Sequence, residues 1–157
     1  SLRFFGFTDD GSVSEFGTNA KMTEVNAALG LCCLDNLEWI LDHRKNLANS
    51  YSRVLRRCKG VKILNSDNPG FQTNNLYYPI LLENEQVLEE LSEKLISNGI
   101  SPRRYFYPSL NTIEVFDLTP CPNSEDFSER VLCLPIHTDL DVDSVEMIAE
   151  HVVNLIG

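Results

Sequence analysis

Residues 17–31 of this 157-residue chain read GTNAKMTEVNAALGL. Thr23 is a good helix cap, because its hydroxyl can accept a hydrogen bond from a backbone amide of the first turn. Glu24 follows in that turn, where a carboxylate is favoured by the helix dipole. We therefore predict a helix that starts after Thr23 and carries the apolar residues Val25, Ala28, Leu29, Leu31 and Cys32.

A second helix is predicted directly after the first. Asp35 and Glu38 have the spacing of a capping box. From there one stripe recurs at alternating steps of four and three, through Leu37, Leu41, Arg44, Ala48, Tyr51, Leu55 and Cys58. The stripe covers about six turns, and we expect Gly60 to end it as a left-handed residue. So long a helix with one apolar stripe is typical of a helix that lies across a sheet or joins two domains.

Short strands are predicted at three places beyond this helix: residues 61–64, 75–82 and 100–106. Pro79 favours a sheet edge for the second strand, because proline cannot donate a ladder hydrogen bond. Residues 65–70 read NSDNPG, which is the composition of a turn.

Three further amphipathic helices alternate with these strands. They are predicted at residues 85–98, stopped by Gly99, at residues 124–131, capped by Ser124, and at the end of the chain, capped by Asp143 together with Glu146. This alternation predicts an α+β domain in which a small sheet is covered by helices, one of them long.

Composition excludes several classes of function. The net charge of −10 argues against a nucleic-acid-binding face, which needs a surplus of lysine and arginine. No segment approaches the roughly 18 consecutive apolar residues of a membrane span, and no signal-peptide pattern is present. Five cysteines, an odd number without a Cys-x-x-Cys pair, favour reduced thiols in a cytoplasmic protein, most of them packed among apolar residues, and no metal site is expected.

Two places could bind a ligand. Asn19 and Lys21 offer an amide and an ammonium group just before a helix start, where anions are favoured, but loop polarity and capping are the more ordinary explanation of them. The second place is residues 101–111, SPRRYFYPSLN, a stiff basic segment in an acidic chain. Its arginines could bind phosphate and its aromatic rings could lie against a base or sugar, but chemistry alone leaves ligand contact as open as its absence.

The chain resembles the DegT/DnrJ/StrS family of PLP-dependent nucleotide-sugar aminotransferases. Residues 17–31 match the family stretch G-x-N-x-(R/K)-M-(S/T)-E-x-x-A-A-x-G-L. The pattern R-x3-A-x2-Y-x3-L starts at Arg44, a GI…YF-x-P-x-(L/H) segment covers residues 99–110, and an LP pair stands at residues 134–135. These matches run nearly end to end, in order and at sensible spacing.

The resemblance implies the small C-terminal domain of an aspartate-aminotransferase-type enzyme, that is, fold type I. Residues 1–34 would be a remnant of the large PLP domain with a dimer-interface helix, and residues 35–157 the small α+β domain. PLP would lie at a homodimer interface. By the resemblance Asn19 reaches the PLP phosphate of the other subunit. Nucleotide-sugar contacts are implied for Lys21, Arg103, Arg104, Tyr105, Tyr107 and Asn111, although the family often has histidine at the last position.

The implied reaction moves an amino group from an amino acid, commonly glutamate, to a keto nucleotide sugar. None of the lysines stands in a context that resembles the Schiff-base lysine of the family. We therefore expect no catalytic residue in this chain, no PLP bound by it alone, and a C-terminal fragment of the enzyme. The alternatives are a stand-alone interaction module that kept the fold and lost the chemistry, and an unrelated α+β binding domain.

Overall fold

The computed structural model describes residues 2–64, 73–115 and 119–156. Two units are distinguished along the chain, Ser1–Glu38 and Trp39–Gly157, and each is described by itself. The predicted turn at residues 65–70 lies outside the described residues. The predicted domain boundary between residues 34 and 35 stays a prediction.

The first unit begins with a segment that folds back on itself. Phe4 forms an isolated bridge with Asn19, and Phe7 forms another with Val13. Two glycines allow the close approach of backbone that this needs. A Cβ on Gly6 would lie 1.9 Å from the carbonyl oxygen of residue 15, and a Cβ on Gly17 would lie 2.1 Å from the nitrogen of Gly6.

Helix α1, Glu24–Asp35, completes the first unit and begins as predicted. The Thr23 hydroxyl accepts a hydrogen bond from the amide of Asn26 at 3.2 Å. No residue of α1 is buried, so its apolar side chains remain exposed: Val25, Leu29, Leu31 and Leu34. Cys32 and Cys33 are exposed with them, so the expectation that they are packed among apolar residues is wrong.

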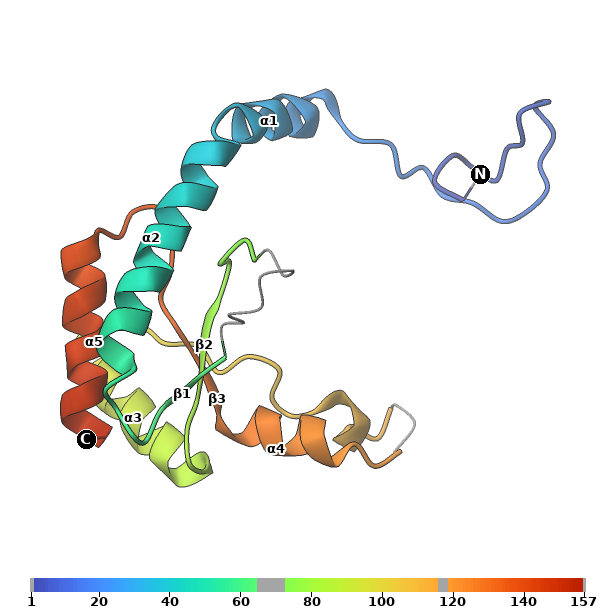
Figure 1. Ribbon diagram of the computed structural model, residues 1–157. Helices are drawn as coiled ribbons and strands as arrows, with labels where there is room; N and C mark the ends of the chain where they lie inside the picture. The colour runs from blue at the N-terminus through green and yellow to red at the C-terminus, as the bar shows by residue number, and fades with distance from the viewer. Residues whose placement is uncertain (1, 65–72, 116–118, 157) are drawn as a thin grey trace. The chain divides into compact units, whose positions relative to one another are not determined.

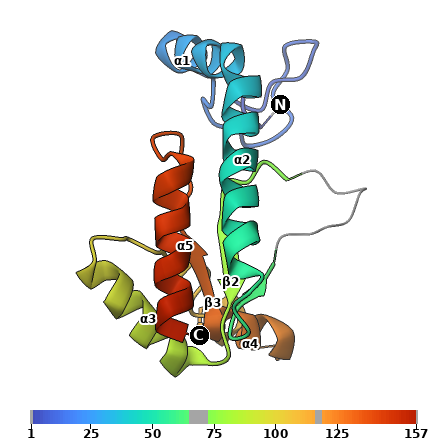
Figure 2. The same ribbon diagram turned by 60° about the vertical axis from the view of Figure 1, so that its left-hand side comes forward.

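The elements after α1 are α2 (Leu37–Leu55), β1 (Lys62–Ile63), β2 (Tyr78–Leu81), α3 (Glu85–Ser97), the 3-10 turn η1 (Leu110–Thr112), α4 (Pro122–Arg130), β3 (Val131–Leu134) and α5 (Val142–Ile156). The described strands form an antiparallel sheet in the order β1-β2-β3. Helices α2, α3 and α5 lie together on one side of this sheet (Figures 1 and 2). The predicted α+β class is confirmed.

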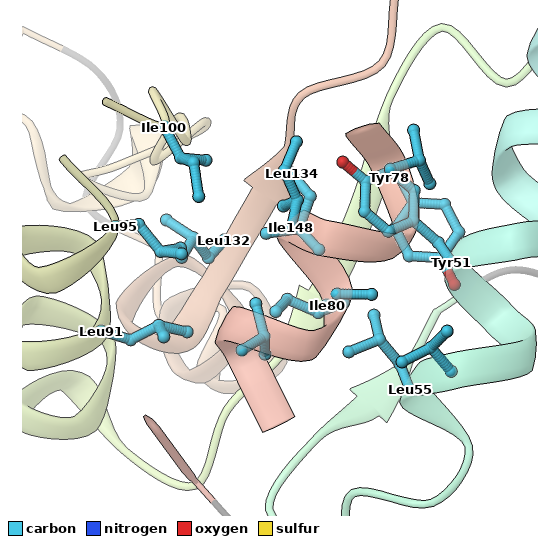
Figure 3. Close-up of a cluster of buried hydrophobic side chains, with 14 of the residues drawn as sticks. Tyr51, Leu55, Tyr78, Ile80, Leu91, Leu95, Ile100, Leu132, Leu134 and Ile148 are labelled. Carbon is cyan, nitrogen blue, oxygen red and sulfur yellow. The ribbon is translucent and has the colours of Figure 1, made fainter. Parts of the chain in front are cut away.

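The core lies between that side of the sheet and the three helices (Figure 3). Tyr51 of α2 is fully buried and stacks on Tyr78 of β2, with ring centroids 4.7 Å apart. Burial raises the pKa of Tyr51, and burial raises the pKa of Tyr78 to about 12, so both rings stay neutral at physiological pH. Other core side chains are Leu55, Ile80, Leu91, Leu95, Leu132, Leu134, Val145, Ile148 and Val152.

Pro79 lies in the central strand, so the predicted edge position is wrong. Its carbonyl oxygen accepts from the amide of Leu64, which shows that Pro79 presents its backbone to the β1 side of β2. Its missing N–H therefore falls just beyond β1, which has only two residues. On the other side Cys133, opposite Pro79, pairs with Arg103 instead. A short neighbour lets the central strand carry a proline.

The strand predicted at residues 100–106 is also wrong. Arg103 alone pairs with β3, through two backbone hydrogen bonds with Cys133 at 2.9 and 2.8 Å. The chain then leaves the strand direction, because Phe106 adopts a positive φ of 62°.

Several helix ends differ from the prediction. Gly99 ends α3 with a φ of +77°, as expected. Pro122 is the first residue of α4, where its missing N–H costs nothing, so Ser124 is not the cap. Helix α5 starts at Val142, and the side chain of Asp141, not Asp143, accepts from the amide of Ser144 at 2.8 Å.

Gly60 does not end α2, which stops at Leu55. Its role is close packing, since a Cβ there would lie 2.3 Å from Cγ2 of Ile156. We expect Gly60→Ala to lower the free energy of unfolding by about 1–3 kcal/mol, the usual cost of overpacking, as measured by urea unfolding.

The control for that substitution is Gly30→Ala, because no atom lies within 4 Å of a Cβ at Gly30. It should leave stability unchanged or raise it by up to about 1 kcal/mol, the helix preference for alanine over glycine. Adding Ile156→Ala to Gly60→Ala should remove much of the penalty of the glycine substitution. Equal unfolding midpoints for Gly60→Ala and the parent would contradict the packing role.

Candidate functional site

The segment between α3 and α4 is anchored at three places. Arg103 is held by its backbone to β3, Arg104 by its side chain to α3 and α4, and Ser109 by its hydroxyl to α4. Between the second and third anchors, Tyr105, Phe106 and Tyr107 follow one another. Residues that are adjacent in sequence therefore have different surroundings here.

Arg104 is the central anchor. Its guanidinium donates to a carboxylate oxygen of Glu85 at 2.5 Å and to the carbonyl oxygen of Glu129 at 3.1 Å. It also lies 3.4 Å from the ring centroid of Tyr107, a cation–π contact. Hydrogen bonds from Arg104 and Tyr107 hold the pKa of Glu85 below its usual value. With a side chain only 20% exposed, Arg104 joins two helices rather than facing solvent.

Asn111 belongs to the third anchor. Its amide donates to Glu125 at 2.6 Å, and its amide oxygen accepts from the hydroxyl of Ser109 at 2.6 Å. Ser109 in turn shares a hydrogen bond with Ser124 at 2.9 Å. The pKa of Glu125 is lowered by the backbone amide of Cys121 and then by Asn111. These bonds tie η1 to the first turn of α4.

A groove of about 690 Å³ lies along β3 within the second unit. Its polar or aromatic lining side chains are Tyr77, Asn98, Ser101, Arg103, Tyr105, His137 and Ser144, and its apolar lining comes from Leu76, Ile100, Leu134, Pro135, Ile136, Leu140, Met147 and Ile148. Cys133 also lines it, but burial raises the pKa of its thiol to about 11. The groove can hold a ligand with apolar, aromatic and cationic contacts, and its thiol is no nucleophile at neutral pH.

Tyr105 contacts the other aromatic and cationic side chains at one wall of this groove. Its hydroxyl accepts from Arg103 at 3.0 Å, and the Arg103 guanidinium lies 5.8 Å from its ring centroid. Tyr77 meets the same ring edge-on at 4.7 Å, and Phe106 lies at 5.7 Å on a tilted plane. Arg103, Tyr105 and Tyr77 thus lie together at this wall, and Phe106, which does not line the groove, contacts Tyr105.

Asn19 and Lys21 lie in the first unit. Asn19 is exposed, and its side chain makes no hydrogen bond to the described residues, 2–64, 73–115 and 119–156. Lys21 places its ammonium 5.1 Å from the ring centroid of Phe4 and 5.8 Å from that of Phe5. The amide is free to donate, while the ammonium already has aromatic partners.

The seven residues predicted for ligand contact are therefore placed in three groups. Arg103 and Tyr105 meet at the groove. Arg104, Tyr107 and Asn111 are engaged with α3 or α4. Asn19 and Lys21 belong to the other unit.

Tyr77 was missed as a site residue. The strand pattern contained the signal, since the residue before buried Tyr78 must face the other way.

Other kinds of site were searched in the same residues. Among residues 2–64, 73–115 and 119–156 no cluster of three or more histidine, cysteine or acidic side chains could hold a metal ion. None of the described helices has the length and apolar character needed to cross a membrane.

Comparison with known proteins identifies the relatives of this chain. The profile of the DegT/DnrJ/EryC1/StrS aminotransferase family matches residues 1–153. The dTDP-4-amino-4,6-dideoxy-D-glucose transaminase of Shigella dysenteriae is 33% identical over 153 residues, which are 94% of this chain and 41% of the relative. The UDP-4-amino-4,6-dideoxy-N-acetyl-beta-L-altrosamine transaminase of Helicobacter pylori is 27% identical over 157 residues, 91% of this chain and 39% of the relative.

Solved structures of sugar aminotransferases are similar to this chain as well. The structure of DesI in the presence of its TDP-sugar product superposes with a TM-score of 0.85 and 29% identity, covering 98% of this chain and 40% of that protein. The chain thus spans about two-fifths of the length of the proteins it matches.

Proposed function

Because the chain belongs to the DegT/DnrJ/EryC1/StrS aminotransferase family, we propose that it forms the C-terminal part of a nucleotide-sugar aminotransferase. The intact enzyme would transfer an amino group, with glutamate as the expected donor, to a keto nucleotide sugar. The observation that carries this proposal is the 33% identity to a dTDP-sugar transaminase over 94% of the chain.

The cofactor of the intact enzyme would be PLP, which supplies an electron sink for the bonds that change at the amino-bearing carbon. Asn19 is the residue of this chain that fits it. Its exposed amide, without a hydrogen-bond partner among the described residues, can donate to a phosphate oxygen. We propose that Asn19 binds the PLP phosphate of the partner subunit.

The sugar nucleotide would lie against the segment that follows α3. Arg103 and Tyr105 would contact it from the groove wall, and Lys21 would contact it from the first unit. Arg104, Tyr107 and Asn111 would support this contact indirectly, because their contacts with α3 and α4 hold the segment in place.

A homodimer is the assembly we propose. Helix α1 exposes several large apolar side chains, and exposed apolar side chains are enriched at interfaces. In this proposal residues 1–34 are the remnant of the large domain with its interface helix, and residues 35–157 are the small domain. The described cysteines are free thiols, which supports a cytoplasmic location.

The test compares the 157-residue chain with the product of its complete gene. Each is incubated with PLP, glutamate and a 4-keto dTDP or UDP sugar, and the amino sugar is measured by mass spectrometry. We expect product from the intact protein and none from the 157-residue chain, since none of its lysines lies in a context resembling the Schiff-base lysine.

Two results would overturn parts of this proposal. If the complete gene product binds neither nucleotide sugar nor PLP, the stand-alone interaction module is favoured instead. If the 157-residue chain alone makes the amino sugar, one of its own lysines must serve the cofactor.

A further inference from the structure

Arg44 of α2 is a charged residue at a core-facing position of its helix. It belongs to the stripe whose later members Ala48, Tyr51 and Leu55 are buried. Arg44 itself is partly buried, and its Nε is buried without a hydrogen-bond partner. Among residues 2–64, 73–115 and 119–156 the guanidinium of Arg44 makes no ion pair with a carboxylate.

Other arginines of the second unit show what Arg44 lacks. Three of them pair with a carboxylate of the described residues: Arg53 with Glu146, Arg104 with Glu85, and Arg130 with Asp126. Arg104 also has a buried Nε without a partner, but its terminal nitrogen donates to Glu85 and to the carbonyl of Glu129. A guanidinium that loses water on burial needs such acceptors in exchange. In the described part of the chain Arg44 has none.

Arg44 lies where α2 contacts one wall of the groove. Tyr51, about two turns later on the same face of the helix, donates to the carbonyl oxygen of Pro135 at 2.7 Å. His43, the residue before Arg44, donates through its Nε2 to the carbonyl oxygen of Leu140 at 2.8 Å. Pro135 and Leu140 both line the groove. Arg44 is therefore placed along α2 between two contacts with this wall.

We propose that Arg44 binds a carboxylate of the amino-acid donor in the intact enzyme. This inference rests on the proposed function, and it gives the donor a residue of its own. A guanidinium binds a carboxylate through two parallel hydrogen bonds. Every amino-acid donor carries a carboxylate, whereas Asn19 is proposed for the cofactor phosphate, and Arg103 and Tyr105 for the sugar nucleotide.

The experiment uses the intact protein with PLP and two probes titrated by calorimetry, glutarate as an unreactive dicarboxylate and uridine diphosphate. Arg44→Gln should weaken glutarate binding about 10- to 150-fold, the usual effect of losing a hydrogen bond to a charged group. It should leave uridine diphosphate binding unchanged. Arg44→Lys keeps the charge but not the planar fork, so its glutarate affinity should be intermediate.

Lys45→Gln is the matched control. Lys45 is the next residue of α2, is also cationic and is exposed. Its substitution changes the net charge by the same amount at almost the same place. Lys45→Gln should therefore bind both probes like the parent.

Kinetics and thermal unfolding give two further readouts. Arg44→Gln should lower kcat/KM for glutamate and leave kcat/KM for the keto sugar unchanged, because the two substrates react in separate halves of a transamination. Without a probe, Arg44→Gln should keep or raise Tm, since it removes a partly buried charge that lacks a partner. Glutarate should raise the Tm of the parent and not that of the variant.

Three outcomes would overturn the inference. If Arg44→Gln binds glutarate as tightly as the parent, Arg44 does not hold the donor, although the proposed function stands. If Arg44→Gln lowers Tm and weakens both probes alike, the anion that Arg44 binds belongs to the protein itself. If the parent binds neither probe and transfers no amino group, the proposed function is wrong and the inference with it.

Discussion

Asn19→Ala in the intact enzyme is expected to weaken PLP retention roughly 10- to 150-fold. The reason is the loss of one hydrogen bond to a charged phosphate, typically worth about 1.5–3 kcal/mol. The side chain contributes little to the fold, since its amide makes no hydrogen bond within the described residues and only its backbone pairs with Phe4. PLP content after dialysis, read from the absorbance of the cofactor, measures the effect.

The control for this substitution is Asn26→Ala. Asn26 is also an exposed asparagine of the first unit, and its backbone amide, which the substitution keeps, donates to Thr23. It should retain PLP like the parent. If Asn19→Ala retains the cofactor equally well, the assignment across the subunit interface is wrong and Asn19 is an ordinary loop residue.

Helix periodicity was the part of the fold that the sequence predicted best. The buried residues of α5 are Val145, Ile148, Ala149 and Val152, whose spacing is that of the amphipathic helix predicted at the end of the chain. Thr23 and Gly99 were also identified correctly, because capping and left-handed termination depend on local chemistry. These two local features were therefore readable without a structure, whereas the caps predicted at Ser124 and Asp143 were wrong.

Features determined by residues far apart in the sequence could not be predicted from it. Pro79 can lie in the central strand only because β1 is so short. The length of that neighbouring strand cannot be predicted from the proline itself. Gly60 was assigned to a helix end, yet its constraint comes from Ile156, nearly a hundred positions later. Long-range packing decided both cases.

The composition of residues 101–111 predicted a candidate site there. It did not predict which of these residues line the groove and which contact the helices. Arg103 and Arg104 are the same residue type in adjacent positions. Only the structure separates them, placing Arg103 at the groove and Arg104 against Glu85. Tyr105 and Tyr107 separate in the same way, since one meets Tyr77 and the other stacks on Arg104. Arg103 and Arg104 face opposite ways as neighbours in an extended chain do, and the positive φ of Phe106 separates Tyr105 from Tyr107.

Tyr51→Ala should lower the free energy of unfolding by about 3–5 kcal/mol, as for other large aromatic residues removed from a core. Tyr51 is fully buried, stacks on Tyr78, and donates its hydroxyl proton to the carbonyl oxygen of Pro135 at 2.7 Å. Pro135 lines the groove. Tyr51 therefore connects the core to the candidate site.

Comparison of two substitutions separates the ring from the hydroxyl. Tyr51→Phe keeps the stacking on Tyr78 and loses the bond to Pro135, so it should cost only about 0.5–1.5 kcal/mol in urea unfolding. Tyr77→Ala removes a half-exposed ring and should change stability by less than about 0.5 kcal/mol, which makes it the control. If Tyr51→Phe costs as much as Tyr51→Ala, the hydrogen bond from the hydroxyl to Pro135, and not the packing of the ring, supplies the stability. In that case nucleotide binding should weaken in Tyr51→Phe as well, because Pro135, which lines the groove, would lose its hydrogen bond to α2.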